Sequence, residues 1–114
     1  MAKNLHHPAR EQIELSAVLE ALSEPIRRDI VLRLLDEGEA PCQAASDFAP
    51  KTNLSYHYAR LREAGLTRAR AVGPYRMISV RVDDLAARFP GLLDAIVAAA
   101  RAAKRTEDRV EASS

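Results

Sequence analysis

The sequence predicts one mainly helical domain that carries a single β-hairpin, an α+β arrangement in the order α-α-α-α-β-β-α. Its 114 residues, 47% of them hydrophobic, are enough for one modest core. With 4% aromatic residues and no Trp, that core must be built from Leu, Ile, Val and Ala, as in small helical domains. Apolar residues recur at helical spacing along most of the chain and alternate over 75–82.

The first predicted helix begins near Arg10 and runs for about three turns, because four apolar residues follow the i, i+3, i+4, i+7 rule: Leu15, Val18, Leu19 and Leu22. Ser23 ends it and is the expected N-cap of a second helix, since its hydroxyl can accept a hydrogen bond from a free amide. Gly38 is the expected end of that second helix. Its predicted buried stripe consists of Ile26, Ile30, Leu34 and Leu35.

A short third helix is predicted over about 42–48, with Ala44, Ala45 and Phe48 facing inward. Ala49 and Pro50 then make the turn to a fourth helix over 51–64, which Gly65 ends. On this fourth helix the apolar side is formed by Leu54, Tyr58 and Leu61. Two short helices joined by a tight turn make a helix-turn-helix when the second carries a polar outward face.

Two strands are predicted next, over 67–72 and 75–82, and the second places Ile78, Val80 and Val82 on one face. The connection Gly73-Pro74 is not of the Asn-Gly type that favours a two-residue hairpin, so we expect a looser tip. A hairpin that follows directly on the polar helix is a wing. The predicted fold is therefore a winged helix-turn-helix.

Asp83 or Asp84 is expected to cap a short helical turn over 84–89, and Pro90 starts a final helix that reaches about Lys104. The apolar stripe of this final helix consists of Leu92, Leu93, Ile96, Val97 and Ala100. The domain is thus expected to span 10–104, between a mobile arm over 1–9 and a disordered tail over 105–114.

The outward face of the fourth helix is rich in hydrogen-bonding groups and poor in acids. Hydroxyl and amide groups can meet base edges, while Lys and Arg can meet the phosphates of DNA. Tyr56 and His57 could instead pack against the turn, and Arg62 could pair with a carboxylate. With the two arginines of the hairpin included, the expected DNA contacts are Lys51, Thr52, Asn53, Ser55, Tyr56, His57, Arg60, Arg70 and Arg76.

The net charge of +1 conceals a basic block. Between Lys51 and Val82 there are seven basic residues and one acid, Glu63, which gives 7 − 1 = +6 and leaves 1 − 6 = −5 for the rest of the chain. Such a block is expected where one face of a protein meets phosphates. The alternative is a solvated basic face without a partner.

Two segments, 22–31 (LSEPIRRDIV) and 54–66 (LSYHYARLREAGL), resemble the two signature blocks of the ArsR/SmtB family of small winged-helix transcriptional regulators. The resemblance runs from about Leu15 to Val97. It implies a homodimer that binds an inverted repeat in double-stranded DNA, and the ancestry favours repression. In such proteins the first and last helices pair across the dimer axis, so the implied interface consists of Leu15, Val18, Leu22, Leu92, Leu93, Ile96 and Val97.

The chain departs from this family at the metal sites. One family site needs a Cys-x-Cys pair, where this sequence has the single Cys42, and the other draws Asp and His from the last helix, where 92–104 contains Asp94 and no His. No cofactor is therefore expected, although a weak metal site involving His6, His7 or Cys42 stays open. Pro74 also stands where many relatives place a basic residue, which shifts the expected wing contacts to Arg70 and Arg76.

The sequence excludes several other classes. No Ser/His/Asp or Cys/His arrangement and no glycine-rich phosphate loop is visible, so we do not expect an enzyme. No apolar run approaches the ~20 residues of a membrane span, and the first residues lack a signal-peptide core, so we expect no membrane contact and a cytoplasmic location. A single cysteine agrees with a reducing compartment.

One alternative function stays open. The domain could be a winged-helix protein-interaction module or co-regulator, bound to a second regulatory protein that supplies effector sensing. Binding that depends on salt would favour DNA over such a partner.

Overall fold

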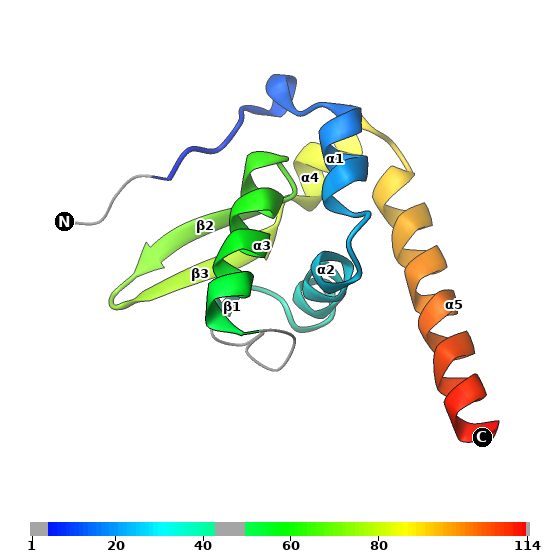
Figure 1. Cartoon of the computed structure of the whole chain (residues 1–114). Helices are drawn as coiled ribbons and strands as arrows, with labels where there is room; N and C mark the ends of the chain where they lie inside the picture. Colours follow the sequence, from blue (N-terminus) through cyan, green and yellow to red (C-terminus); the bar gives the residue numbers. More distant parts are fainter. Residues whose placement is uncertain (1–4, 43–49, 114) are drawn as a thin grey trace.

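The computed structural model describes residues 5–42 and 50–113, except the side chains at 51, 52, 112 and 113, and confirms the winged helix-turn-helix (Figure 1). The expected helix over 42–48 lies outside the described residues apart from its first residue. In chain order the elements are η1 (Arg10–Gln12), α1 (Leu15–Ala21), α2 (Pro25–Glu37), β1 (Ala40–Pro41), α3 (Lys51–Glu63), β2 (Thr67–Val72), β3 (Tyr75–Val80), α4 (Val82–Arg88) and α5 (Leu92–Ser113).

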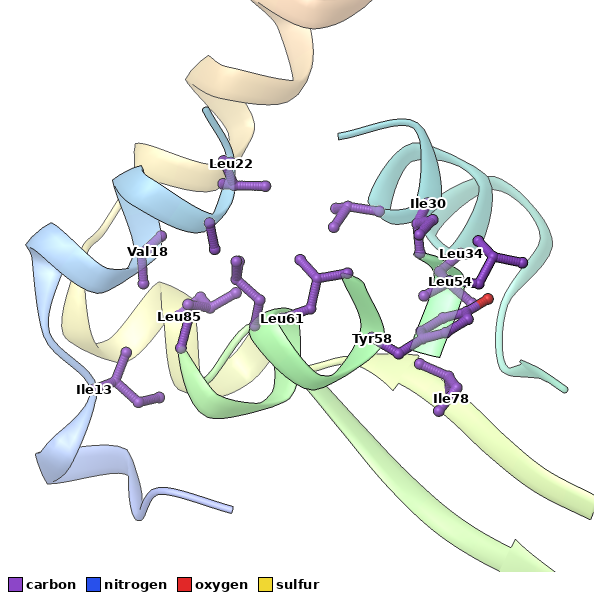
Figure 2. Packing of buried hydrophobic residues seen from close by; sticks show 14 residues of the cluster. Ile13, Val18, Leu22, Ile30, Leu34, Leu54, Tyr58, Leu61, Ile78 and Leu85 are labelled. Atoms are coloured by element: carbon purple, nitrogen blue, oxygen red, sulfur yellow. The ribbon is translucent and has the colours of Figure 1, made fainter. Parts of the chain in front are cut away.

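The core lies between the helices and the inner face of the sheet, and Figure 2 shows its side chains converging from α1, α2, α3, α4 and β3. The expected apolar side of α3 is confirmed, since Leu61 is 0% exposed and Leu54 and Tyr58 are also buried. Ile13 is 1% exposed and was missed, because it stands between η1 and α1 and belongs to no helical stripe.

The sheet has the strand order β1-β3-β2 in the described part of the chain. Strands β2 and β3 are antiparallel, and Val72 stands opposite Tyr75, so the tip is a two-residue turn. The expectation of a looser tip is wrong. Gly73 has φ +57, which a type II′ turn requires at its first central position, and the fixed φ of Pro74 suits the second. The two-residue β1 was not predicted, because it is too short to show alternation.

Helix α1 begins at Leu15, later than expected. It buries Val18 and Ala21 and leaves Leu15 and Leu19 exposed by 45% and 46%, so the predicted apolar stripe is split between core and surface. Helix α2 has Glu24 rather than Ser23 as its N-cap, and the Glu24 carboxylate accepts a hydrogen bond from the Ile26 amide at 3.2 Å. Its end at Gly38 (φ +85) is as expected.

The second strand of the hairpin ends at Val80 rather than Val82, because Arg81 turns inward and is 6% exposed. Arg81 donates to the Asp84 carboxylate at 2.8 Å and also to the backbone oxygen of Pro8 at 2.8 Å. The N-cap of α4 is Arg81, so neither Asp83 nor Asp84 caps this helix as we expected.

The segments at either end of the described residues differ from what the sequence suggested. Residues 5–9 pack on the domain, where His7 Nε2 accepts a hydrogen bond from the Ala69 amide at 3.0 Å. Helix α5 continues to Ser113 instead of ending near Lys104, through a stretch that contains neither Gly nor Pro. None of the described helices has the length and apolar character of a membrane span.

Candidate nucleic-acid interface

Helix α3 separates a buried side from an exposed polar side. Asn53 and Ser55 are exposed, and Tyr56 is 58% exposed, so three of the residues expected to meet DNA lie on the outward face. The side chains of Lys51 and Thr52, which were expected beside them, lie outside the described part of the structure. The first turn of α3 contains no acid, so nothing in that turn repels a phosphate.

Tyr58 anchors the buried side of α3. Its hydroxyl donates to the backbone oxygen of Cys42 at 3.0 Å, which ties α3 to the segment after β1. Burial raises the pKa of Tyr58 to about 12, so the phenol stays protonated and keeps this donor at neutral pH. The exposed face of α3 is therefore held in a fixed orientation by hydrogen bonding as well as by apolar packing.

His57 does not lie on the outward face where we expected it. It is 9% exposed, and its Nδ1 is 3.1 Å from Nη1 of Arg27, a residue of α2 that is itself 6% exposed. The Arg27 Nε also donates to the backbone oxygen of Ala21 at 2.6 Å. His57 thus joins α3 to α2 and does not lie on the exposed face of α3. The spacing already held this signal, since His57 follows Leu54 by three positions and precedes Leu61 by four.

The burial of His57 predicts a pH-dependent stability. Burial, together with the nearby Arg27 charge, holds the pKa of His57 below its ordinary value. As the pH falls, His57 is therefore protonated in the unfolded chain at about pH 6.5, whereas in the folded chain it is protonated only at a lower pH. The free energy of unfolding is consequently highest above about pH 6.5 and decreases as the pH is lowered. We expect His57→Gln, which keeps an acceptor for Arg27 but cannot titrate, to show a shallower fall in urea unfolding between about pH 7.5 and pH 5.

His7 needs a control in this experiment. Burial also lowers the pKa of His7, so it adds to the same fall in stability. His7→Gln measured alone and together with His57→Gln separates the two contributions, and an unchanged pH slope in His57→Gln would contradict the assignment.

Arg60, another expected DNA contact, is turned toward α1. Its Nη2 donates to both carboxylate oxygens of Glu20, with 2.6 Å to Oε2, and this contact holds the pKa of Arg60 above its ordinary range. The Arg60 Nε is buried and has no hydrogen-bond partner in the described structure. Arg60 therefore links α3 to Glu20 of α1.

Most of the basic block is engaged within the chain. Arg70 binds Glu39 through two hydrogen bonds of 2.6 and 2.7 Å, Arg68 pairs with Asp84 at 3.4 Å, and Arg62 donates to the His6 backbone oxygen. The charge count predicted a free cationic face, because it covered 51–82 and the partner carboxylates of Glu39 and Asp84 lie outside that range. Exposed ion pairs of this kind are worth about 0–1 kcal/mol, so a phosphate can displace the carboxylate.

Arg76 differs from the other described arginines of the block. It is exposed, and it forms no ion pair with another described residue. It stands opposite Ala71 on the hairpin, near the turn. The sequence predicted phosphate contacts of the wing at Arg70 and Arg76. Of these two side chains, Arg70 is paired with Glu39, whereas Arg76 is exposed and has no ion pair among the described residues.

Two of the residues considered for a metal site, His7 and Cys42, have other surroundings in the structure. His7 uses its Nε2 as an acceptor from Ala69, and burial raises the pKa of the Cys42 thiol. Within residues 5–42 and 50–113, no three His, Cys, Asp or Glu side chains are grouped as metal ligands.

The implied dimer residues occupy two environments. Val18 and Leu22 are buried inside the single chain, where they pack near α4 and α5. Leu15 is exposed, and the residues of α5 are half-buried, namely Leu92, Leu93, Ile96 and Val97. Leu15 and its neighbour Leu19 thus offer the apolar surface that Val18 and Leu22 do not.

Comparisons with known proteins agree with this geometry, although no protein-family model matches the chain. The chain is 34% identical over 82 residues to the uncharacterized HTH-type transcriptional regulator YceK of Bacillus subtilis (strain 168), which covers 69% of this chain and 82% of that protein. Its fold is similar to a crystal structure of an ArsR family transcriptional regulator, with a TM-score of 0.54, 21% identity, and 96% and 98% of the two chains covered. A second crystal structure, described as a possible transcriptional regulator for arsenical resistance, matches with a TM-score of 0.53 and 26% sequence identity. This match covers 89% of the present chain and 98% of that chain.

Proposed function

The chain belongs to the helix-turn-helix transcriptional regulators and has the fold of the ArsR family, and on this premise we propose that it represses transcription by binding an inverted repeat as a homodimer. The proposed role is binding rather than catalysis. A cytoplasmic location is part of the same proposal, because a repressor must reach its DNA.

The observation that carries this proposal is the exposed side of α3. Asn53, Ser55 and Tyr56 present an amide, a hydroxyl and a phenol on one helix whose opposite side is locked into the core. Such groups hydrogen-bond to base edges in the major groove, which is wide enough to admit a helix. The residues near the start of a recognition helix are the ones that reach those edges.

A homodimer suits the exposed apolar residues of α1. Leu15 and Leu19 lie one helical turn apart, and each is nearly half exposed in a single chain. A twofold axis would cover both and would present two copies of α3 to two half-sites of an inverted repeat.

The proposal predicts that base readout and phosphate contact fail differently. Ser55→Ala or Tyr56→Ala should cost on the order of 1–3 kcal/mol on a duplex selected from a random library, with little change on scrambled DNA. Arg76→Ala should weaken both and reduce the salt slope by about one unit for each phosphate that the variant no longer neutralises. Titrations at several salt concentrations on both duplexes measure these effects.

Thr106→Ala is a matched control, because Thr106 is an exposed residue of α5 whose hydroxyl donates to the backbone oxygen of Ala102 in the same helix. It should leave affinity and salt slope unchanged. An unchanged ratio of selected to scrambled affinity in both Ser55→Ala and Tyr56→Ala would refute base reading by α3. Binding without salt dependence would favour the protein-interaction alternative.

A further inference from the structure

The buried pair of Arg27 and His57 connects three helices at one point. The Arg27 Nε donates to the Ala21 backbone oxygen at the end of α1, and its Nη1 lies 3.1 Å from Nδ1 of His57 in α3. A guanidinium can only donate, so Nδ1 of His57 is the acceptor and the proton of the neutral imidazole lies on Nε2. Both side chains are buried, so water has little access to replace this hydrogen bond.

Protonation of His57 breaks the hydrogen bond to Arg27. An imidazolium has no acceptor, so two donors of like charge would face each other across 3.1 Å. Burial and the Arg27 charge both oppose the protonated form and hold the pKa of His57 below its ordinary value, whereas Glu24 at the start of α2 favours that form. The protonated pair therefore separates.

The separation moves the His57 side of the pair. Arg27 stays bonded to the Ala21 backbone oxygen at 2.6 Å, and the next turn of α3 is held by the hydroxyl of Tyr58 as well as by its apolar side. The rings of His57 and Tyr56 are in edge-to-face contact, with their centroids 5.5 Å apart. A shift of the imidazole is therefore transmitted to the exposed ring of Tyr56, while the core contacts of α3 remain.

We propose that Arg27 and His57 are positioning residues for base reading: the neutral pair holds Tyr56 in the orientation that meets base edges, and protonation of His57 releases it. The inference rests on the proposed DNA-binding function and adds a dependence on pH. Base contacts carry the sequence information, whereas phosphate contacts do not. Acid should therefore lower the preference for a selected sequence and leave contact with phosphates in place.

The test measures the ratio of the affinities for a selected and a scrambled duplex between about pH 7.5 and about pH 5. The wild-type ratio should fall by about tenfold, as for one mismatched base pair, with a midpoint below the ordinary histidine pKa of 6.5. His57→Ala should give a low ratio at every pH. His57→Gln should restore the ratio and remove its pH dependence, because glutamine offers Arg27 an acceptor that does not titrate.

Arg28→Lys is the matched control. The Nη1 of Arg28 donates to the Leu22 backbone oxygen at 2.8 Å, at the same end of α1, so this variant should keep the wild-type pH profile. Arg27→Lys should instead lower the ratio at neutral pH, because an ammonium lacks the fork of donors that meets both partners. His7→Gln removes the other histidine whose pKa burial lowers. Circular dichroism at each pH checks that every variant is folded.

Nitrogen NMR of the imidazole shows when His57 of the folded protein is protonated. The inference is overturned if the wild-type ratio stays constant through that protonation, if His57 of the folded protein remains neutral down to about pH 5, or if His57→Gln keeps the wild-type pH dependence. In each of these cases the selectivity at neutral pH remains, and with it the proposed function. If the wild type does not distinguish the two duplexes at neutral pH, the proposed function fails and takes the inference with it.

Discussion

Gly65→Ala should lower the free energy of unfolding by roughly 2–5 kcal/mol, one of the largest effects of any single substitution in this chain. Gly65 has φ +86, and a Cβ there would lie 2.6 Å from Cγ1 and 2.9 Å from Cδ1 of Ile13. The left-handed backbone costs a side chain about 1–2 kcal/mol, and overpacking adds about 1–3 kcal/mol. Ile13 cannot easily move, because it is 1% exposed and its β-branch restricts χ1.

Gly38→Ala is the matched control for this prediction. Gly38 has nearly the same backbone conformation, φ +85, but a Cβ there would meet nothing within 4 Å. The destabilisation should therefore be the backbone cost alone, about 1–2 kcal/mol. Urea unfolding of both variants measures the difference, and equal destabilisation would show that contact with Ile13 contributes nothing.

A double-mutant cycle sharpens the assignment. Ile13→Ala removes the atoms that the new Cβ would strike, so Gly65→Ala should cost less in that background than in the wild type. Gly65 lies in the connection between α3 and β2, so its left-handed backbone is part of the turn from the outward-facing helix to the wing.

The sequence predicted the parts of the fold that depend on periodic patterns. Leu54, Tyr58 and Leu61 recur at helical spacing and are all buried. The predicted inner face of the hairpin is correct for Ile78, which is 3% exposed, and wrong for Val82, which begins α4 and is 45% exposed. Parts of the chain without a repeating apolar pattern were not predicted. Ile13 contributes a fully buried side chain from the connection between η1 and α1, and β1 is a two-residue strand whose pairing depends on β3, far along the chain.

The exposure of the hydrogen-bonding face of α3 was predicted, but the ion pairs of the basic residues were not. Asn53, Ser55 and Tyr56 are exposed as expected, because the opposite side of α3 is defined by apolar residues. A count of arginines cannot show which carboxylates lie beside them. Arg60 meets Glu20 and Arg70 meets Glu39 across gaps of 40 and 31 residues, so these contacts depend on the tertiary fold.

The second large effect is expected at the proposed dimer interface. Leu15→Glu combined with Leu19→Glu should convert a dimer into a folded monomer, because it places two carboxylates from each subunit in an apolar seam. Both leucines are nearly half exposed in the single chain, so the monomer should keep its stability. A monomer binds one half-site at a time, so the gain from linking two subunits is lost. The affinity for an inverted repeat should therefore fall by roughly 10²–10⁴-fold. Sedimentation at micromolar concentration and DNA titration measure the two effects.

Val82→Glu is the control for this double substitution, since Val82 on α4 is 45% exposed, as Leu15 is, and lies outside the proposed seam. It should leave both the dimer and the DNA affinity intact. The double variant should also bind a single half-site about as well as a wild-type subunit does, because α3 is unchanged. A wild-type chain that sediments as a monomer, or a double variant that remains a dimer, would show that α1 does not form the subunit contact.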